Sequence, residues 1–137
     1  MQKALRYVGK GAQILITVLL VLLLICNLYL ITMNRILGVE HPTILGYSTA
    51  VVASGSMEPA LSVDDLILNH VQTSYEEGDI ITFQSGGSLT THRIVSVTNE
   101  GYITRGDANN TYDQNVTPPE AVIGRVVGVI PRVGSVL

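Results

Sequence analysis

The sequence predicts a mainly β protein, in which an N-terminal transmembrane helix precedes a compact antiparallel β domain. Three observations support this class. One long uncharged apolar segment lies near the N-terminus, six short β-prone runs follow it, and the later region hardly ever repeats apolar residues at helical spacing. With 137 residues the chain has room for one ordinary domain, yet a mean hydropathy of +0.39 and 14% charged residues are too apolar for a small soluble one.

The apolar excess is concentrated in residues 11–34, which run for 24 positions without a charge. As an α-helix this stretch reaches ~36 Å and crosses the ~30 Å hydrocarbon core of a bilayer. A cleaved signal peptide also begins with basic residues, but its apolar region has only about 7–15 residues. In addition, Cys26–Tyr29 offers no small-residue cleavage site. We therefore expect a transmembrane signal-anchor helix over residues 12–34.

The charges divide across this segment. Lys3, Arg6 and Lys10 precede it without any acidic residue, whereas all eleven Asp and Glu residues follow it. By the positive-inside rule, residues 1–11 are expected in the cytoplasm and residues 35–137 form an extracytoplasmic β-rich domain. The acidic outer domain also argues against nucleic acid as a partner, because nucleic acid binding needs a face rich in Lys and Arg.

The outer region alternates β-branched or apolar runs with clusters of Ser, Gly, Asn and Pro, which is typical of strands and turns. Ser85–Ser88, with two central glycines, indicates a hairpin. Six short runs favour a compact antiparallel sheet or a partly open barrel. The predicted strands are Thr49–Ala53, Asp65–Val71, Asp79–Gln84, Leu89–Thr98, Tyr102–Arg105 and Val122–Ile130.

The predicted core is small, because the chain has one Phe and no Trp and must rely on Val, Ile and Leu. We therefore expect apolar surface to remain around Met57 and along residues 126–137, and this surface would rest on the bilayer or on another protein.

Cysteine usage limits the chemistry. The only cysteine, Cys26, lies in the predicted membrane helix, which excludes an intradomain disulfide, a thiolate zinc site and a cysteine nucleophile outside the membrane. Because no thiol is available there, any nucleophile must be an oxygen. We also expect no metal and no cofactor.

Ser54-Gly55-Ser56 places two hydroxyls around a glycine at the end of a predicted strand. Such a string is most often only a turn. It is nevertheless suited to catalysis, because glycine lets the chain turn sharply and leaves backbone N–H groups free to face an oxyanion.

A serine nucleophile needs a base, and no lysine follows Lys10, which excludes a Ser-Lys dyad outside the membrane. Three histidines remain. His41 lies beside the membrane segment and His70 at a strand end, and both are expected to be structural. His92 lies next to Arg93 inside a β-branched run, where it belongs either to an exposed edge or to a group of polar partners.

Asp107 and Asp113 lie six residues apart in a turn-rich segment. This composition fits Asx turns or a calcium loop about as well as a catalytic acid, although the Gly and the terminal Glu of an EF-hand are missing. Serine, histidine and aspartate in this order form the minimum set for acyl transfer, in which the carboxylate holds the imidazole tautomer.

Five strings in a fixed order resemble type I signal peptidases of the ER-type branch, over roughly residues 45–134. This resemblance implies the signal peptidase β fold and a serine endopeptidase that removes signal peptides from secretory preproteins, cutting after small residues. The strings are Ser54–Pro59, Glu77–Phe83, Thr91–Val95, Gly106–Asn109 and Ile123–Pro131.

The resemblance also implies roles for single residues. Ser56 becomes the nucleophile and His92 the general base, at the place where bacterial housekeeping enzymes have a lysine. Asp113 becomes the triad acid and Asp107 a supporting residue. Ser54 resembles the side chain that forms the oxyanion hole together with the Ser56 N–H.

The implied partners are secretory preproteins and the lipid bilayer, with a secretion translocon as a further candidate. The implied location is the plasma membrane, or the ER membrane in a eukaryote. Asn-x-Thr sequons at Asn109 and Asn115 crowd the acid loop. Because a glycan there would block the site, they favour a prokaryotic plasma membrane.

The main alternative is a non-catalytic membrane-anchored β-domain or an assembly subunit of related fold. The complete set of Ser56, His92 and Asp113 counts against it. A self-cleaving regulator of related fold would need a lysine base or a cleavable cytoplasmic segment, and neither is found in the sequence.

Overall fold

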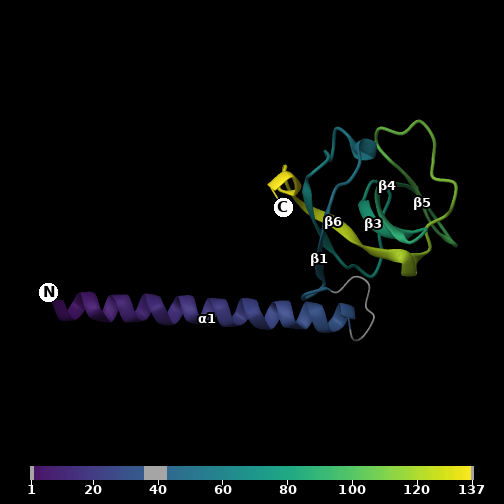
Figure 1. Ribbon diagram of the computed structural model, residues 1–137. Helices are drawn as coiled ribbons and strands as arrows, with labels where there is room; N and C mark the ends of the chain where they lie inside the picture. Colours follow the sequence, from purple (N-terminus) through teal and green to yellow (C-terminus); the bar gives the residue numbers. More distant parts are fainter. Residues whose placement is uncertain (1, 36–42, 137) are drawn as a thin grey trace. The chain divides into compact units, whose positions relative to one another are not determined.

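A computed structural model of the protein describes residues 2–35 and 43–136. The chain divides into two compact units, Met1–Pro42 and Thr43–Leu137, and each is considered by itself. The first contains the helix α1 (Gln2–Arg35) and the second contains all six strands (Figure 1).

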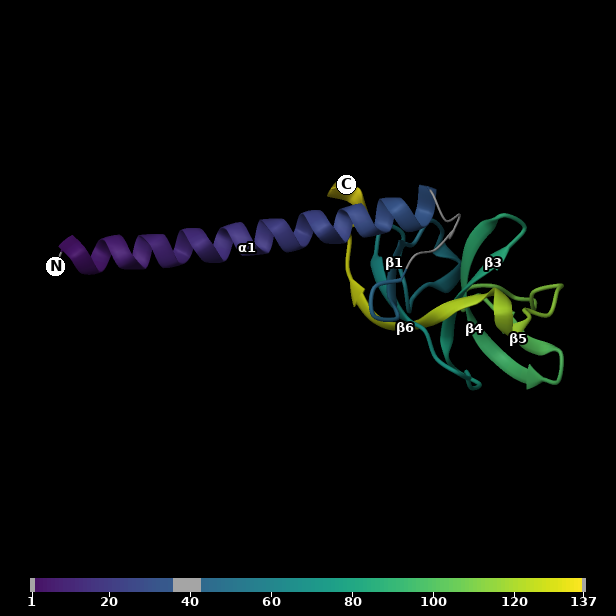
Figure 2. The same ribbon diagram turned by 90° about the horizontal axis from the view of Figure 1, so that it is seen from below.

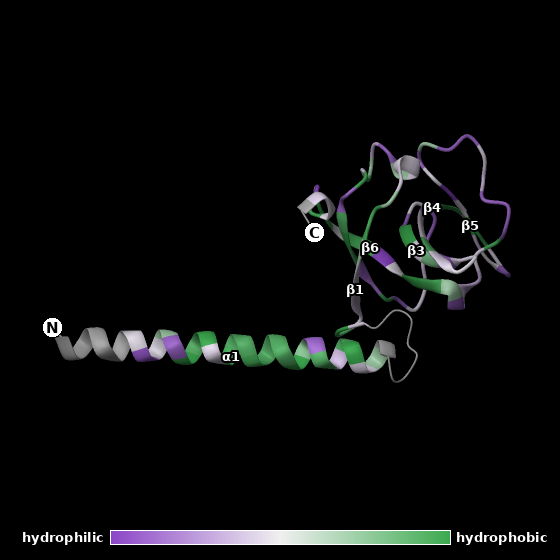
Figure 3. Cartoon of the chain, in the orientation of Figure 1, coloured by the Kyte–Doolittle hydropathy of each residue, from purple (hydrophilic) through white to green (hydrophobic). Residues whose placement is uncertain are grey.

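Within α1, Gly9–Met33 is long and apolar enough to cross a membrane, and it is not buried against protein. The middle of the helix is uniformly hydrophobic (Figure 3). Three of its polar side chains bond back to the helix itself: Thr17 and Thr32 donate to carbonyls four residues earlier, and Asn27 Nδ2 donates to Leu23 O at 2.9 Å. Internal partners of this kind suit a helix in lipid, where no water is present to satisfy polar groups.

The second unit is a six-stranded sheet in which every neighbouring pair is antiparallel, in the order β1-β2-β6-β3-β4-β5. All six predicted strands are confirmed, with ends that differ by no more than two residues. The mainly β fold with an N-terminal apolar helix is therefore confirmed. The strands are β1 (Tyr47–Val51), β2 (Leu66–His70), β3 (Ile80–Ser85), β4 (Ser88–Thr98), β5 (Gly101–Arg105) and β6 (Val122–Ile130).

The last strand, β6, joins the two halves of the sheet, because it pairs with β2 on one side and with β3 on the other (Figure 2). Gly124 allows this close approach. A Cβ at that position would lie 2.9 Å from the backbone of His70, which is too close for any side chain.

The predicted hairpin is also confirmed. Ser85 of β3 pairs with Ser88 of β4, and the two glycines between them have φ angles of 56° and 84°. Two consecutive residues with positive φ are what a tight two-residue hairpin turn requires.

Two apolar clusters stabilise the sheet, and Met57 is a member of one of them with only 1% of its surface exposed. The expectation that Met57 would contribute to an exposed apolar surface is therefore wrong, because a short 3₁₀ turn directs it into the core. Ile130 of β6 is 56% exposed, and its contact with a bilayer or a partner remains a prediction. One cluster contains Tyr75, Ile81, Phe83, Ile94 and Tyr102, and the other contains Val52, Met57, Leu61 and Ile67.

A small polar network centred on Thr82 also connects strands of the sheet. Thr82 has no exposed surface, and its Oγ1 donates to Asn69 Oδ1 at 2.9 Å and lies 2.9 Å from Thr91 Oγ1. These side-chain contacts link β3 to its neighbour β4 and, across β6, to β2.

Candidate active site

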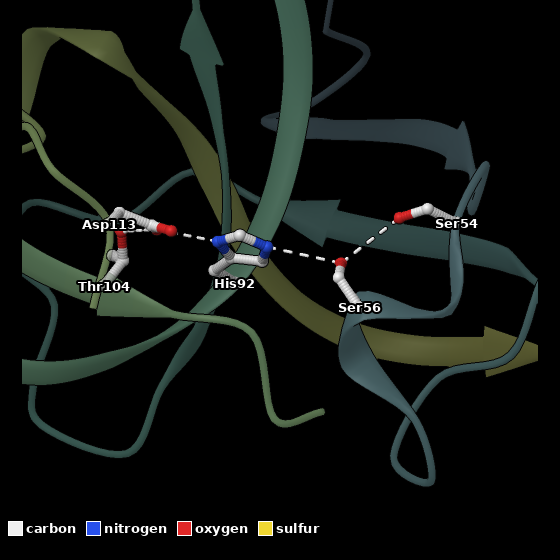
Figure 4. Close-up of polar contacts among 5 residues, drawn as sticks. All are labelled: Ser54, Ser56, His92, Thr104 and Asp113. Carbon is white, nitrogen blue, oxygen red and sulfur yellow. Dashed lines mark hydrogen bonds and ion pairs between the residues drawn. The ribbon is translucent and has the colours of Figure 1, made fainter. Parts of the chain in front are cut away.

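Ser56 lies in the 3₁₀ turn η1 (Gly55–Met57), which follows β1. Ser54 is extended before the turn, with φ −143° and ψ 160°, and the Glu58 N–H closes the turn by donating to Gly55 O at 3.1 Å. The buried Met57 side chain anchors the turn on one side. The Ser56 hydroxyl is thereby directed toward β4 (Figure 4).

His92 comes from the first half of β4, and its Nε2 lies 3.3 Å from Ser56 Oγ. The residue is only 7% exposed and its ring packs edge-on against Phe83. Because β4 lies between β3 and β5, the alternative that His92 belongs to an exposed edge strand is wrong. A buried imidazole of this kind needs polar partners on both ring nitrogens.

Asp113 supplies the second partner. Its Oδ2 lies 2.7 Å from His92 Nδ1, and the same oxygen accepts from Thr104 Oγ1 at 2.6 Å. A carboxylate at Nδ1 favours the tautomer with the proton on that nitrogen, and Nε2 then accepts from the Ser56 hydroxyl. The three side chains therefore form a continuous line from carboxylate to imidazole to hydroxyl (Figure 4).

Asp107 lies on the same loop as Asp113, after β5, but its carboxylate contacts Arg93 and not His92. Arg93 Nε and Nη2 donate to its two carboxylate oxygens at 2.8 and 2.6 Å, and Arg93 Nη1 donates to Gly78 O. This hydrogen bonding holds the pKa of Asp107 below its usual range and raises the pKa of Arg93. Of the two aspartates predicted for the site, Asp113 contacts His92 directly, whereas Asp107 pairs with the neighbouring arginine.

The same loop contacts the backbone of the serine turn, because the Ala108 N–H donates to Ser56 O at 2.9 Å. Gly106 makes this contact possible. A Cβ on Gly106 would lie 2.5 Å from Ser56 O and 2.7 Å from Asn109 Nδ2.

Ser54 lies within reach of the candidate nucleophile, and its Oγ donates to Ser56 Oγ at 3.2 Å. A hydroxyl in this position is a suitable donor to negative charge that develops beside Ser56. A cavity of about 470 Å³ opens beside His92 and Asp113, and Phe83, Thr90 and Val116 contribute to its walls.

His70, the other histidine that the structure describes, is not part of this group. His70 stacks on Tyr47 with ring centroids 4.4 Å apart, and His41 lies outside the described residues. Within residues 2–35 and 43–136, no group of three His, Cys, Asp or Glu side chains is arranged to hold a metal ion.

Sequence reasoning missed the partner of Arg93 and the contact of Thr104 with Asp113. The His92-Arg93 pair signalled only that polar partners were needed. Which residues these are depends on the pairing of β4 with β5 and on the path of the loop that follows.

The sequence profile of the Peptidase S24-like family matches residues 46–127, which include Ser56 and His92 as well as both loop aspartates. The chain belongs to this family. The matched range begins at the residue before β1 and ends within β6, so it covers nearly the whole sheet.

This S24-like chain is also similar to named signal peptidases, which confirms the resemblance to the ER-type branch. It is 35% identical over 125 residues to signal peptidase I W of Bacillus subtilis, covering 85% of the chain and 65% of that relative. It is 34% identical over 102 residues to the signal peptidase complex catalytic subunit SEC11 of Metarhizium robertsii, covering 63% and 59%. It is 32% identical over 115 residues to the human subunit SEC11C, covering 72% and 57%. The chain thus spans less than two thirds of the length of each of these relatives.

Proposed function

We propose that this S24-like protein is a membrane-anchored serine endopeptidase that removes N-terminal signal peptides from secretory preproteins. The observation that carries the proposal is the line of contacts from Ser56 Oγ through the His92 ring to Asp113 Oδ2, at 3.3 and 2.7 Å. The names of the relatives, which include signal peptidases from a bacterium and from two eukaryotes, support the same activity.

In the proposed mechanism, His92 Nε2 takes the proton of Ser56 Oγ as this oxygen attacks the scissile carbonyl. Asp113 stabilises the imidazolium that forms. The Ser56 N–H and the Ser54 hydroxyl donate to the oxyanion. His92 then gives its proton to the leaving amine, and the acyl-enzyme is hydrolysed by a water molecule that the same imidazole activates.

The apolar helix has a function in this proposal. If α1 and the hydrophobic segment of the preprotein share one bilayer, the effective concentration of substrate rises and the cut lies at a set distance from the membrane. Lys3, Arg6 and Lys10, which precede the uncharged part of α1, favour a cytoplasmic N-terminus and an extracytoplasmic catalytic domain. The plasma membrane is the proposed location, and contact with a translocon would place the site near emerging preproteins.

The proposal is tested with the purified full chain in detergent and a preprotein that ends its signal segment in Ala-x-Ala. The parent is expected to release the mature protein, and Ser56→Ala is expected to lose all cleavage above background. Ser62→Ala is the matched control, since Ser62 is an exposed serine in the loop before β2 and should leave the rate unchanged.

The outcomes separate this function from its alternative. If Ser56→Ala cuts as fast as the parent, Ser56 is not the nucleophile. If the folded parent cuts no preprotein at all, the non-catalytic anchored domain is the better description of the chain.

A further inference from the structure

Thr104 is a fully buried polar residue beside the candidate triad, and it is the last but one residue of β5. It pairs with Ile94 of β4, two residues after His92. Because alternate residues of a strand share a face, the Thr104 side chain lies on the same face of the sheet as the His92 ring. No surface of Thr104 reaches solvent, so its hydroxyl must find a partner within the protein.

That partner is the Asp113 carboxylate. Thr104 Oγ1 donates to Asp113 Oδ2 at 2.6 Å, and Thr104 O accepts from the Asp113 N–H at 2.9 Å. An ionised carboxylate only accepts hydrogen bonds, so the hydroxyl proton must point at Asp113. Thr104 therefore holds Asp113 at two points, one on the side chain and one on the backbone.

We propose that Thr104 is a positioning residue for the proposed peptidase reaction: it fixes the Asp113 carboxylate so that Oδ2 receives His92 Nδ1. This role rests on the proposed function, and it adds a fourth residue to the serine, histidine and aspartate that the sequence predicts.

The geometry explains why a fixed carboxylate matters here. Oδ2 accepts from Thr104 and lies 2.7 Å from His92, so rotation of the carboxylate would break two contacts at once. The threonine is a stiff support, because its β-branched side chain has few rotamers and its backbone belongs to a paired strand. With the carboxylate held, His92 keeps its proton on Nδ1 and leaves Nε2 free to accept from Ser56.

A purely structural role makes a different prediction. The Thr104 hydroxyl would then only donate a hydrogen bond that holds the 106–113 loop on the sheet. Its loss would lower the stability of the fold without changing the rate of the chemical step. Thr82 offers a matched comparison, because it is another fully buried threonine in the sheet whose hydroxyl donates to a side chain outside the triad, Asn69.

The experiment compares the full chain in detergent with Thr104→Val, Thr104→Ser and Thr82→Val, measuring kcat, KM and Tm on one preprotein. We expect Thr104→Val to lower kcat roughly tenfold, the effect of losing one hydrogen bond to a charged group, with KM within about twofold. Thr104→Ser retains the hydroxyl and should keep most of kcat. Thr82→Val should lower Tm while kcat stays at the parent value.

Three results would overturn the role of Thr104: an unchanged kcat in Thr104→Val, an equal loss in Thr104→Ser, or an equal loss in Thr82→Val. If Thr104→Val does not fold, Thr104→Cys takes its place. Its thiol has a similar size and is only a weak donor.

A second measurement needs no cleavage. NMR of the ¹⁵N-histidine-labelled chain reports which nitrogen of neutral His92 carries the proton. We expect Nδ1–H in the parent and in Thr104→Ser, and a mixture of tautomers in Thr104→Val. A mixture in Thr104→Val with an inactive parent would overturn the peptidase function but support the positioning role. The same tautomer in all variants of an active parent would overturn the positioning role alone.

Discussion

Asp107 and Arg93 form a two-point ion pair, in which Nε and Nη2 of the guanidinium donate to separate carboxylate oxygens at 2.8 and 2.6 Å. This pair engages Asp107 and leaves Asp113 as the loop carboxylate that reaches His92. The two aspartates therefore have separate tasks. Asp113 lies behind the imidazole, while Asp107 fixes the loop to β4, next to the point where the Ala108 N–H contacts Ser56.

The division of tasks predicts unequal effects of the same substitution. Asp113→Asn should lower kcat by roughly 10⁴-fold, the scale for replacing the acid of a serine triad by its amide, because Asn does not favour the proton on His92 Nδ1. Asp107→Asn should cost far less in kcat, since its partner is Arg93. Single-turnover cleavage of a preprotein measures both. Equal losses in the two variants would contradict the assignment of Asp113 as the acid.

The Arg93–Asp107 pair also predicts how stability depends on pH. Arg93 lowers the pKa of Asp107 in the folded protein, chiefly through their hydrogen bonds. The pair therefore stabilises the fold at every pH above the ordinary carboxyl pKa of about 4, and this stability is lost as pH falls below that value and through the lower folded pKa. The arginine is partly exposed, so its contribution is modest, about 1 kcal/mol at most.

We accordingly expect Asp107→Asn to lower Tm at pH 7, by no more than the roughly 4–8 °C that corresponds to about 1 kcal/mol in a domain of this size. The difference from the parent should be constant down to about pH 5 and should shrink below pH 4, as Asp107 becomes protonated. Thermal unfolding of the full chain in detergent across this pH range tests the prediction. A difference that grows in acid would mean that Asp107 is stabilised in its neutral form instead.

The sequence was sufficient to predict the six strands, because all six are short apolar or β-branched runs, and five of them are followed directly by Gly, Ser, Asn or Pro. It did not predict their order. β6 pairs with both β2 and β3, and this arrangement depends on close approaches such as that of Gly124 to His70. These contacts are between residues far apart in the chain, and local patterns carry no information about them.

The same reason limits what could be said of the site. Ser56, His92 and Asp113 were predicted as residue types in order, but whether they met depended on the sheet. Thr104 gave no signal at all, since a threonine in a strand is ordinary until its partner is known. Met57 was misjudged because its burial depends on a single turn, η1, whose direction the string Gly55-Ser56-Met57 does not determine.

The contact between Ser54 and Ser56 predicts a separate contribution to the chemical step. Ser54→Ala removes the hydroxyl that donates to Ser56 Oγ at 3.2 Å, and the backbone of the turn should be unaffected. We expect kcat to fall by roughly 10²-fold or more, as for the loss of one oxyanion donor, with little change in KM or Tm. Ser54→Thr keeps a hydroxyl and should recover part of the rate. If Ser54→Ala retained the full rate, Ser54 would be only a turn residue.

The close packing around Gly106 predicts that even a methyl group at this position disturbs the site, although Gly106 is not a member of the triad. In Gly106→Ala the new methyl group would lie 2.5 Å from Ser56 O, which is backbone, so the 106–109 loop must move away from the serine turn. The bond from the Ala108 N–H to Ser56 O should then be lost, and both Tm and kcat should fall. Gly128→Ala in β6 is the matched control, because its methyl group would meet only the Leu68 side chain at an ordinary 3.6 Å. We expect the control to match the parent in both measurements, and a Gly106→Ala variant that also matched the parent would show that the loop does not brace Ser56.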